Sequence, residues 1–463
     1  MASTDFFKRI DDAVVFFKQH GSDQTIRIIS HLDTDGICSC ALLIKALKRE
    51  KIEYNVTIVP QLDKNLIKQF AKETYNFFIF SDLGSGQINL INEFFKEKNV
   101  LILDHHRLNN MRIQSNIFVV NPHEFGINGS SEISGSGVVF YFTKHLNHDN
   151  EKHAHMAIIG GLGDMQERNG FIGLNKEILR IAEKYSISVT KGLRLFGIQS
   201  KPLHKILENC FDPIIPGVSG SEHGTIKFLK KIGINIKTNN RITKYVDLTE
   251  SEKEKLVEGI IQKRHDEKNP EDVFGNIYSL KNEKTGPFKD AREFSTLLNA
   301  CGRLNKSNIG IQALLGNDDM KKNAERILVD YRYAITNALS WYKKNIGTKN
   351  VIEEKNYILI NSKDHILPTM VGTIASILSR SKFLDNGKII ITMGRTIQDK
   401  TKISIRISGK NKSLNVDVNN IIKQIILEVG GEFGGHKTAA GGLIDTKNEE
   451  NFVLTTKRIL KNI

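Results

Sequence analysis

The sequence predicts an α/β protein with a parallel-sheet domain, a helical connector and a smaller C-terminal α/β domain. Short apolar segments of strand length alternate with amphipathic segments of helix length, which is the pattern of a parallel sheet with helical crossovers. Acidic residues follow these apolar segments repeatedly, and the carboxyl ends of parallel strands share the sheet edge where ligands bind. We expect three domains, at residues 1–190, 191–345 and 346–463.

Composition narrows the class of protein. The chain has 463 residues, of which 40% are hydrophobic and 25% charged, as in ordinary globular proteins. A formal charge of +14 favours an anionic partner such as nucleic acid, although abundant lysine can also be only a solvated surface. Four cysteines with neither disulfide nor zinc spacing indicate a reducing, cytoplasmic setting. We expect no signal peptide or membrane helix, because no apolar run approaches about 20 residues.

The first strand and helix carry the first candidate ligands. Residues 5–19 have the apolar spacing of a helix, and residues 25–30 read as a short buried strand. That strand runs into His31, Asp33 and Asp35 before a helix begins. Two carboxylates and a histidine are therefore expected at the carboxyl end of a strand.

The pattern of an apolar segment followed by acidic residues recurs along the N-terminal region. Asp82 follows one apolar segment, and Asp104, His105 and His106 follow another. Asp164 follows a later apolar run, and we expect all of these acids in strand-end positions, converging on one edge of the sheet. Four further strands are expected at residues 55–60, 76–80, 100–103 and 117–120, and a closely packed, glycine-containing helix at 133–146.

The middle of the chain reads as mostly helical, after a proline- and glycine-containing segment at residues 200–241. Thr249 is followed three residues later by Glu252, a capping-box pattern that predicts a helix over 248–264. Further helices are expected at residues 291–301 and 322–344.

The last domain alternates strands and helices again and contains a glycine-rich stretch, Gly430–Gly442. Backbone N–H groups of this stretch, with His436 and Lys437, could bind an anion, or the stretch could be a helix C-cap followed by a turn into a strand. Both readings stay open. Strands are expected at residues 357–360, 388–393 and 401–407, the last two as a hairpin, and helices at 370–378 and 416–429.

Six cations surround this glycine-rich stretch. They could position a nucleic-acid backbone without reading its bases. A solvated hairpin is the alternative, and it is the preferred reading for the outer lysines. The six are Arg395, Lys400, Lys402, Arg406, Lys410 and Lys412.

The acids and histidines of the N-terminal region suit a pair of divalent cations. Two such ions about 3.5–4 Å apart need several carboxylates, one of them bridging, and accept imidazole as well. The mixture of oxygen and nitrogen donors suits Mn²⁺, with Mg²⁺ as the alternative. The competing reading is a scatter of capping and turn residues. The candidate ligands are His31, Asp33, Asp35, Asp82, His105 and Asp164.

These motifs resemble the DHH phosphoesterase superfamily. The order His31-Leu-Asp33-Thr-Asp35-Gly36, Asp82, Asp104-His105-His106, Gly163-Asp164 is similar to the ordered motifs of that superfamily. Gly430–Gly442 resembles the GGGHxxAAG signature of the associated DHHA1 domain. The chain most resembles RecJ-type nucleases, and Asp290–Arg303 is similar to archaeal RecJ-like proteins, including the GINS-associated nuclease. The resemblance implies a DHH catalytic domain, a connector and a substrate-binding DHHA1 domain, with the active site in the cleft between the two α/β domains.

The resemblance also implies a role for each matching position. One metal would be held by His31, Asp33 and Asp82, and the other by Asp35, Asp82, His105 and Asp164. Asp104 would orient a ligand, and His106 would contact the scissile phosphate or the leaving group. Substrate would be bound by Arg303, Ser404, Arg406, Ser408, Gly434, Gly435, His436 and Lys437.

Two departures from the family pattern affect these assignments. Ile407 separates Arg406 from Ser408, where the family's KxSxRS pattern has arginine and serine adjacent, so Ser408 is the least secure of these residues. Glu432 and Phe433 stand where the family often has only glycine before the histidine, which loosens the assignment of individual backbone contacts.

The leading hypothesis is a two-metal exonuclease that hydrolyses single-stranded DNA or RNA to mononucleotides, in DNA replication or repair. A second hypothesis is a phosphodiesterase for small substrates such as oligoribonucleotides, cyclic dinucleotides or a phosphoadenosine phosphate. A third is a replication scaffold that binds GINS and through it the MCM helicase. Loss of metal ligands would have signalled the scaffold, and here every ligand is present. The sequence leaves the polarity of the exonuclease, its preference for DNA or RNA, and the oligomeric state open.

Overall fold

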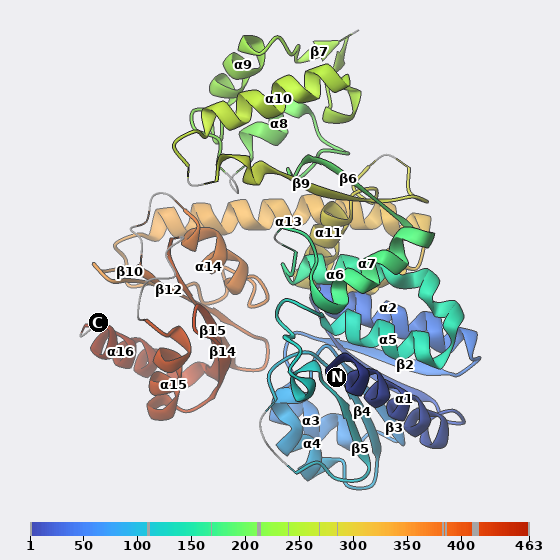
Figure 1. Cartoon of the computed structure of the whole chain (residues 1–463). Coiled ribbons are helices and arrows are strands. Elements are labelled where there is room, and N and C mark those ends of the chain that lie inside the picture. The colour runs from blue at the N-terminus through green and yellow to red at the C-terminus, as the bar shows by residue number, and fades with distance from the viewer. Residues whose placement is uncertain are drawn as a thin grey trace. The chain divides into compact units, whose positions relative to one another are not determined.

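The computed structural model divides the chain into two compact units, Met1–Ile327 and Leu328–Ile463 (Figure 1). It describes residues 2–108, 112–167, 169–210, 214–238, 240–267, 269–284, 286–381, 384, 387–409 and 416–461. Among these residues, no helix is both long and apolar enough to cross a bilayer.

The N-terminal unit is built on a five-stranded parallel sheet with strand order β2-β1-β3-β4-β5. This confirms the parallel-sheet prediction, and each expected strand is present within one or two residues. The strands are β1 (Ile26–His31), β2 (Tyr54–Val59), β3 (Phe77–Ser81), β4 (Asn99–Leu103) and β5 (Ile117–Val120). The helices of this part are α1 (Ala2–His20), α2 (Thr34–Arg49), α3 (Lys64–Ala71), α4 (Ile88–Phe94), α5 (Gly135–Leu146), α6 (Ala154–Gly163) and α7 (Gly173–Tyr185).

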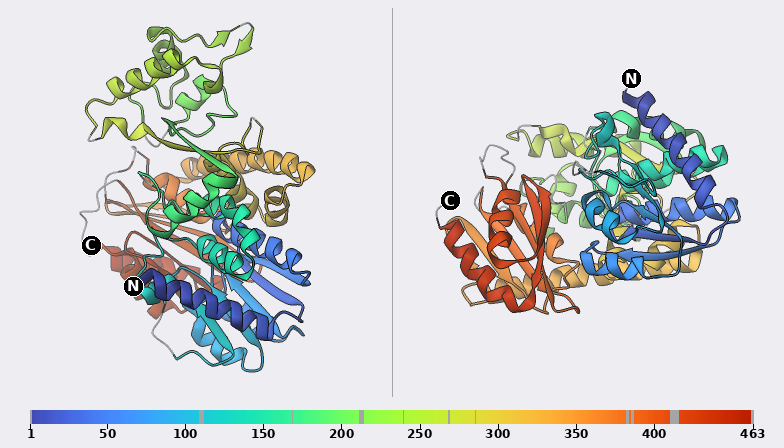
Figure 2. Two further views of the ribbon diagram at one scale, coloured as in Figure 1. Left: turned by 45° about the vertical axis from the view of Figure 1, so that its right-hand side comes forward. Right: turned by 90° about the horizontal axis from the view of Figure 1, so that it is seen from below.

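Alternating side chains of the sheet pack against helices on both faces (Figures 1 and 2). Phe78 and Phe80 point to one face, into a core shared with α3 and α4. Phe77 points to the other face, where its ring contacts Phe16 and Phe17 of α1. The central strands β1, β3 and β4 are thus buried on both sides, which explains why they read as largely apolar runs.

One prediction for this region is wrong. Asp164 does not follow a strand, because residues 154–163 form helix α6 and Asp164 is the residue that ends it. An apolar run of this length is compatible with either a buried strand or a buried helix, and periodicity alone does not separate them.

An insertion follows the parallel-sheet part. Its first strand is β6 (Ile187–Leu193) and its last strand is β9 (Phe274–Leu280). The two strands pair as an antiparallel ribbon that the sequence did not predict. The predicted capping box of Thr249 and Glu252 is present at the start of α10. The remaining elements are α8 (Leu203–Glu208), α9 (Glu222–Lys231), β7 (Lys237–Thr238), β8 (Arg241–Ile242) and α10 (Glu250–Lys263). The three helices α8, α9 and α10 share a hydrophobic core of their own.

Three helices follow the insertion: α11 (Ala291–Arg303), α12 (Ser307–Leu314) and α13 (Asp318–Asn345). α11 packs against α2 and α6 of the parallel-sheet part. Thr34, at the start of α2, donates its hydroxyl to the carbonyl oxygen of Ser295 at 2.7 Å, and its amide donates to Oδ1 of Asn299 at 3.2 Å. α11 therefore supports the acid-bearing loop after β1.

The C-terminal unit is a six-stranded mixed sheet of order β10-β11-β12-β13-β15-β14, and its β12–β13 hairpin confirms the predicted one. α14 (Val371–Ser379) packs on β12 and β13, while α15 (Val418–Val429) and α16 (Glu449–Leu460) pack on one another and share a core with the sheet. The strands are β10 (Val351–Glu353), β11 (Tyr357–Asn361), β12 (Ile389–Arg395), β13 (Lys400–Ile407), β14 (Glu432–His436) and β15 (Ala439–Asp445).

Candidate metal centre and substrate-binding sheet

The end of β1 places His31 beside Asp33. Asp33 is the N-cap of α2, and its Oδ1 accepts the amide hydrogen of Gly36 at 3.1 Å. Its Oδ2 lies 2.9 Å from Nδ1 of His31, and the same nitrogen lies 3.6 Å from Oδ2 of Asp82. The ligand-capable atoms of the three residues lie within 4.8 Å of one another. They form the first of two adjoining ligand sets.

Asp82 follows β3 and stands between the two sets. Its φ of 58° lies in the left-handed region, which costs a residue other than glycine about 1–3 kcal/mol. The side chain is 2% exposed, and neither carboxylate oxygen has a hydrogen-bond partner among the described residues. Oδ1 lies 3.2 Å from Nε2 of His105, whereas Oδ2 faces His31. The two oxygens of this one carboxylate therefore face different groups of side chains.

The second set consists of Asp35, His105 and Asp164. Nε2 of His105 lies 3.8 Å from Oδ2 of Asp35 and 3.3 Å from Oδ2 of Asp164. The amides at the start of α5 hold Asp35 in place, since Gly135 donates to Oδ2 at 2.6 Å and Ser136 to Oδ1 at 3.1 Å. The close packing expected of this glycine-containing helix is thus packing against Asp35. A Cβ on Gly135 would come within 2.5 Å of Asp82.

A buried hydrogen bond sets the tautomer of His105. Its Nδ1 lies 2.6 Å from the carbonyl oxygen of Gly129, which can only accept, so Nδ1 carries the proton. Gln166 donates to the same carbonyl oxygen at 2.8 Å and accepts from Asn175 at 2.7 Å. Nε2 of His105 has no hydrogen-bond partner in the described part of the chain. Nε2 therefore faces the acids, and it is the ring atom that would bind a cation.

Asp104 is buried, and its carboxylate is held by hydrogen bonds from neighbouring groups. It accepts the amide hydrogens of Ser85 at 2.9 Å and His105 at 2.8 Å, and its Oδ1 lies 2.7 Å from Nδ1 of His106. The side chain of His106 is 51% exposed. Asp104 thus fixes the orientation of an exposed imidazole next to the ligand sets.

The crowding of carboxylates is visible in their electrostatics. Burial, together with the negative charge of Asp82, raises the pKa of Asp35 to about 7. Burial and Asp35 likewise raise the pKa of Asp164 well above its usual range. Although burial alone lowers the pKa of His31, the neighbouring Asp33 and Asp82 raise it to about 10. These buried charges repel one another, and divalent cations would relieve that repulsion.

The donor set fits a pair of divalent cations. Asp82 offers two unpartnered buried oxygens and His105 an unpartnered Nε2, and such orphaned groups are costly unless something binds them. Carboxylate oxygens with two imidazoles suit Mn²⁺ and Mg²⁺. All six residues expected as metal ligands are brought together by the fold: His31, Asp33, Asp35, Asp82, His105 and Asp164.

Arg303 belongs to the same unit and lies at the end of α11. Although burial raises the pKa of Asp33, the charges of His31 and Arg303 lower it below its usual range. A Cβ on Gly302 would come within 1.7 Å of the carbonyl oxygen of Leu32. This glycine therefore lets the end of α11 approach the acid-bearing loop closely and bring the guanidinium next to Asp33.

The other residues expected to bind substrate belong to the C-terminal unit. Ser404 and Arg406 point to the same face of β13, because residues two apart share a face of a strand. Ser404 is paired with Gly441 of β15, which is paired with Gly434 of β14. A Cβ on Gly434 would meet no atom within 4 Å. The result is a row of small residues with open space above its outer strand, a surface that a ligand can approach closely.

The other residues of the C-terminal unit that were expected to bind substrate differ from one another in exposure. Ser408 lies just beyond β13, is 1% exposed, and accepts the amide hydrogen of Lys388 at 2.8 Å. Gly435 has φ of 144° and belongs to β14, and Lys437 is exposed in the turn after that strand. The side chain of His436 lies outside the described residues, as do Lys410 and Lys412.

The structure confirms the helix C-cap reading of Gly430–Gly442, whereas anion binding by this stretch stays a prediction. Gly430, with φ of 83°, ends α15, and the stretch then forms the β14–β15 hairpin. Two of the surrounding cations form ion pairs, since Arg395 pairs with Glu449 at 2.9 Å and Lys400 with Asp445 at 2.6 Å.

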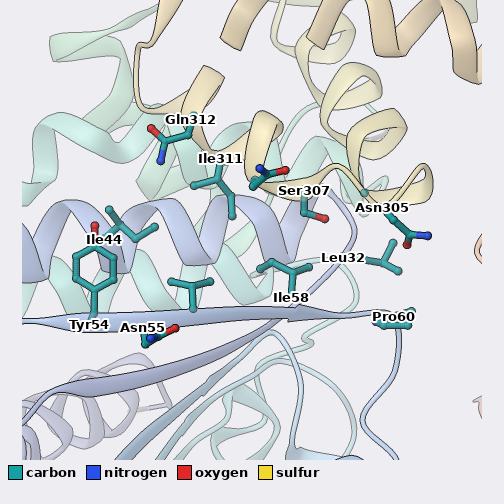
Figure 3. Close-up of a pocket in the computed structure, with 13 residues that line it drawn as sticks. Leu32, Ile44, Tyr54, Asn55, Ile58, Pro60, Asn305, Ser307, Ile311 and Gln312 are labelled. Carbon is teal, nitrogen blue, oxygen red and sulfur yellow. The ribbon is translucent and has the colours of Figure 1, made fainter. Parts of the chain in front are cut away.

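A pocket of about 530 Å³ lies beside β2, the edge strand of the N-terminal sheet (Figure 3). Val56 and Ile58 of β2 and Ile311 of α12 contribute apolar walls, and Asn305 and Gln312 contribute polar groups. It includes no metal ligand. The opposite edge strand, β5, is instead closed by Arg9 of α1, which donates to the carbonyl oxygen of Val119 at 2.8 Å.

The supporting residues of the metal centre were not found by sequence reasoning. Gly129 contacts His105, Gln166 contacts Gly129, and Ser295 of α11 contacts Thr34 in the acid-bearing loop. These residues come from distant parts of the chain, and none stands in a recognisable spacing. The one usable signal was the Gly135–Gly137 segment at the start of α5.

Comparisons with known proteins agree with this organisation. The model of the DHH family N-terminal domain matches residues 25–161, that of the DHH-CID domain residues 195–275, and that of the DHHA1 domain residues 357–462. An uncharacterised protein of Methanocaldococcus jannaschii is 32% identical over 443 residues, covering 94% of this chain and 93% of the relative.

Solved structures share the fold at low sequence identity. Cdc45 from Entamoeba histolytica has a TM-score of 0.64 and 13% identity, covering 99% of each chain. RecJ from Thermus thermophilus, solved with Mn²⁺, has a TM-score of 0.59 and 14% identity, and covers 98% of this chain. This chain spans 55% of that RecJ. With its full-length relative and its three matched domains, the chain belongs to the DHH family and has the RecJ-like DHH–DHHA1 architecture.

Proposed function

We propose that this protein is a two-metal phosphodiesterase that acts as an exonuclease on single-stranded DNA or RNA and releases mononucleotides. The observation that carries the proposal is Asp82, whose two unpartnered oxygens face His31 on one side and His105 on the other. A carboxylate in that position is suited to bridging two cations. Membership of a phosphoesterase family and likeness to RecJ, solved with Mn²⁺, support the same chemistry.

Each residue of the site has a proposed task. Two bound Mn²⁺ or Mg²⁺ ions would supply Lewis acidity and an activated water for in-line attack on phosphorus. His31, Asp33 and Asp82 would hold one ion, and Asp35, Asp82, His105 and Asp164 the other. The catalytic assignments are Asp104, which keeps His106 oriented, and His106, whose exposed imidazole would contact the scissile phosphate or the leaving oxygen.

The substrate would be gripped through its phosphates. Arg303, next to Asp33, has a guanidinium suited to a phosphate oxygen. In the C-terminal unit, Arg406 and Ser404 stand over the row that ends in Gly434, and Gly435, His436, Lys437 and Ser408 complete the proposed set. Ser408 is the weakest member because its hydroxyl is buried and bonded to Lys388. We retain the three-domain division at 1–190, 191–345 and 346–463 as part of this proposal.

Two alternative functions are compatible with the same fold, and a particular observation supports the second. A phosphodiesterase of small substrates would use the same metal centre. A replication scaffold is favoured by the likeness to Cdc45, and we propose binding to GINS, and through it to the MCM helicase, as an additional role. The intact ligand set favours an active enzyme over an inactive scaffold. The four buried cysteines form no disulfide among the described residues, which is consistent with the proposed reducing, cytoplasmic setting. We propose a role in DNA replication or repair there.

The experiment that tests the proposal uses single-stranded DNA and RNA labelled at either end, with Mn²⁺, Mg²⁺ or chelator. Stepwise loss of long strands by the wild type, absent in chelator and in an Asp82→Ala variant, is the expected result, and the label position gives the polarity. Cleavage confined to dinucleotides would support the small-substrate enzyme. No cleavage, with co-purification of GINS, would support the scaffold.

A further inference from the structure

The insertion separates its charges along the chain. Residues 223–246 contain six cations and no acid, whereas residues 247–272 contain nine acids and five cations. The surfaces of ordinary soluble domains intersperse the two signs. We call the six cations of the first segment the basic arm. They are Lys227, Lys230, Lys231, Lys237, Arg241 and Lys244.

The charges of the basic arm are exposed and uncompensated. All six side chains are exposed, and none of them forms an ion pair with another described residue. Two other lysines of the insertion are paired: Lys205 lies 2.8 Å from Glu208 and 3.0 Å from Glu222, and Lys253 lies 2.7 Å from Glu250. The basic arm therefore offers its full positive charge to a partner.

Five of these six cations lie on regular secondary structure. Three of them lie on α9, whose opposite side sends Phe228 and Leu229 into the core of the insertion. Two more lie on the β7–β8 hairpin, which is closed by a 2.9 Å hydrogen bond from the amide of Thr243 to Ile236 and flanked by the buried Ile234 and Tyr245. Figure 1 shows α9 and β7 in the same part of the insertion. The cations are thus presented by ordered elements.

The residue types of the basic arm indicate whether it would bind single-stranded or duplex nucleic acid. Proteins that bind unpaired strands without sequence preference combine a basic groove with aromatic rings on which bases stack. The aromatic residues of this segment, Phe228 and Tyr245, are buried. Lysines, an arginine and the exposed Asn235 and Asn240 are instead suited to phosphate oxygens, which position a nucleic acid without reading bases. A duplex presents its phosphates in a regular array and keeps its bases stacked, so it matches this surface better than a single strand.

We propose that the basic arm is a second nucleic-acid contact that binds the phosphate backbone of duplex DNA. This inference deepens the proposed function and rests on it in one respect, the expectation that the duplex adjoins the single strand being degraded. The insertion would then hold the double-stranded part of a tailed molecule, independently of the metal centre and without sequence preference.

The test measures binding by fluorescence anisotropy in chelator, so that cleavage plays no part. The probes are a labelled 20-base-pair duplex and a single strand of equal length. Three full-length variants are compared with the wild type. In the first, all six cations of the basic arm become Gln, and in the second its five lysines become Arg. The third is a matched control in which six exposed lysines elsewhere become Gln: Lys8, Lys18, Lys72, Lys96, Lys176 and Lys184.

The Gln variant of the basic arm should lose at least tenfold in duplex affinity at low salt. The slope of log K against log salt should fall by about 3–5, since each lost phosphate contact contributes about 0.9. The Arg variant should bind duplex as the wild type does, and single-strand affinity should change less than threefold.

Three results would overturn the proposal: unchanged duplex affinity in the Gln variant, an equal loss in the matched control, or equal losses for duplex and single strand. Thermal melting checks that each variant is folded. If the wild type fails to cleave any strand but its duplex binding depends on the basic arm, the nuclease proposal fails and this one stands. If the wild type cleaves single strands but binds duplex equally well without the basic arm, the nuclease proposal stands and this one fails.

Discussion

The metal centre and the glycine-rich sheet of the C-terminal unit are built on opposite principles. The metal centre gathers charged groups that repel one another, and Asp82 and His105 leave buried atoms without partners. The C-terminal sheet presents neutral backbone and small side chains, as where Gly434 faces open space, and its buried acid Glu449 is fully paired with Arg395 and Thr401.

This difference indicates which interactions stabilise each unit. In the described part of the C-terminal sheet, the buried acid Glu449 receives hydrogen bonds from Arg395 and Thr401 and needs no ligand. The metal centre holds carboxylates whose pKa is raised, as at Asp35 and Asp164, so we expect bound cations to add to its stability. The predictions below test this division, in order of decreasing effect.

Replacing Asp82 by Asn should give the largest effect. Because both oxygens of Asp82 face other ligands, we expect kcat for single-strand hydrolysis to fall about 10³-fold or more. The metal-free variant should melt at a higher temperature than the metal-free wild type, because one repelling charge is gone. Asp11→Asn, at an exposed acid beside His145, is the control. A variant that loses activity and also loses metal-free stability would break the comparison.

Adding Mn²⁺ should stabilise one unit selectively. At a concentration 100 times the dissociation constant, a bound ion contributes about 2.7 kcal/mol to the free energy of unfolding. We expect hydrogen exchange to slow at the ends of β1, β3 and β4 and to remain unchanged in β13–β15. Chelator should reverse the effect. Equal protection of both units would contradict the idea that only one depends on cations.

Arg406→Gln tests the C-terminal surface. Its guanidinium donates to Ser376 at 3.3 Å and to the carbonyl oxygen of Ile405 at 2.9 Å, and its charge is proposed to meet phosphate. We expect kcat/KM to fall about 10–100-fold, as for loss of a charge-assisted hydrogen bond. Mn²⁺ affinity, measured by titration calorimetry, should not change. Weakened Mn²⁺ binding would show that this residue serves the metal centre instead.

Gly434→Ala is a subtler probe of the same surface. The added methyl group meets no atom of the protein within 4 Å, so the melting temperature should stay within about 1–2 °C of wild type. If substrate lies against this strand, kcat/KM should fall several-fold. An equal loss of stability would mean that the row of small residues serves packing. The control for stability is Gly86→Ala, at an exposed glycine where a Cβ also meets no atom within 4 Å.

The two units should respond to pH in opposite directions. Burial raises the pKa of Glu293 in α11 from 4.5 to about 7, so its contribution is present below pH 4.5 and is lost as pH rises through 7. Although burial alone raises the pKa of Glu449, hydrogen bonds from Arg395 and Thr401 lower it. Its contribution is therefore present above pH 4.5 and is lost as pH falls below that value.

Denaturation of two variants measures whether Glu293 and Glu449 contribute to stability with opposite pH dependence. Glu293→Gln should gain up to about 3 kcal/mol over wild type at pH 8 and nothing at pH 4.5. Glu449→Gln should lose stability at pH 7, with the loss shrinking toward pH 4. If both variants respond to pH with the same sign, the contrast between the two units does not extend to their buried acids.

The sequence predicted the fold because its signals were local. Parallel strands could be read from apolar segments, and the convergence of Asp33, Asp82 and His105 then follows from the shared edge of the sheet. Asp164 was misplaced onto a strand because a short apolar run does not separate strand from buried helix. Glycine has low strand propensity, which is why the β14–β15 hairpin was left open.

The supporting contacts could not be predicted for a different reason. Gly129 meets His105 from 24 residues away, and Thr34 meets Ser295 from 261 residues away. No periodicity or spacing encodes such contacts, because they depend on how finished elements pack. A ligand set can be read from a sequence, whereas the atoms that hold it in place require the structure.

The bond between Thr34 and Ser295 also has a consequence for how the protein is made. A ribosome delivers the chain from its N-terminus, and domains generally fold as they emerge. The loop that carries Asp33 and Asp35 receives its last partners only when α11 has been synthesised, after the whole insertion has left the ribosome. For most of translation the acidic loop therefore lacks its hydrogen bonds to α11, and the candidate metal centre is completed late in synthesis.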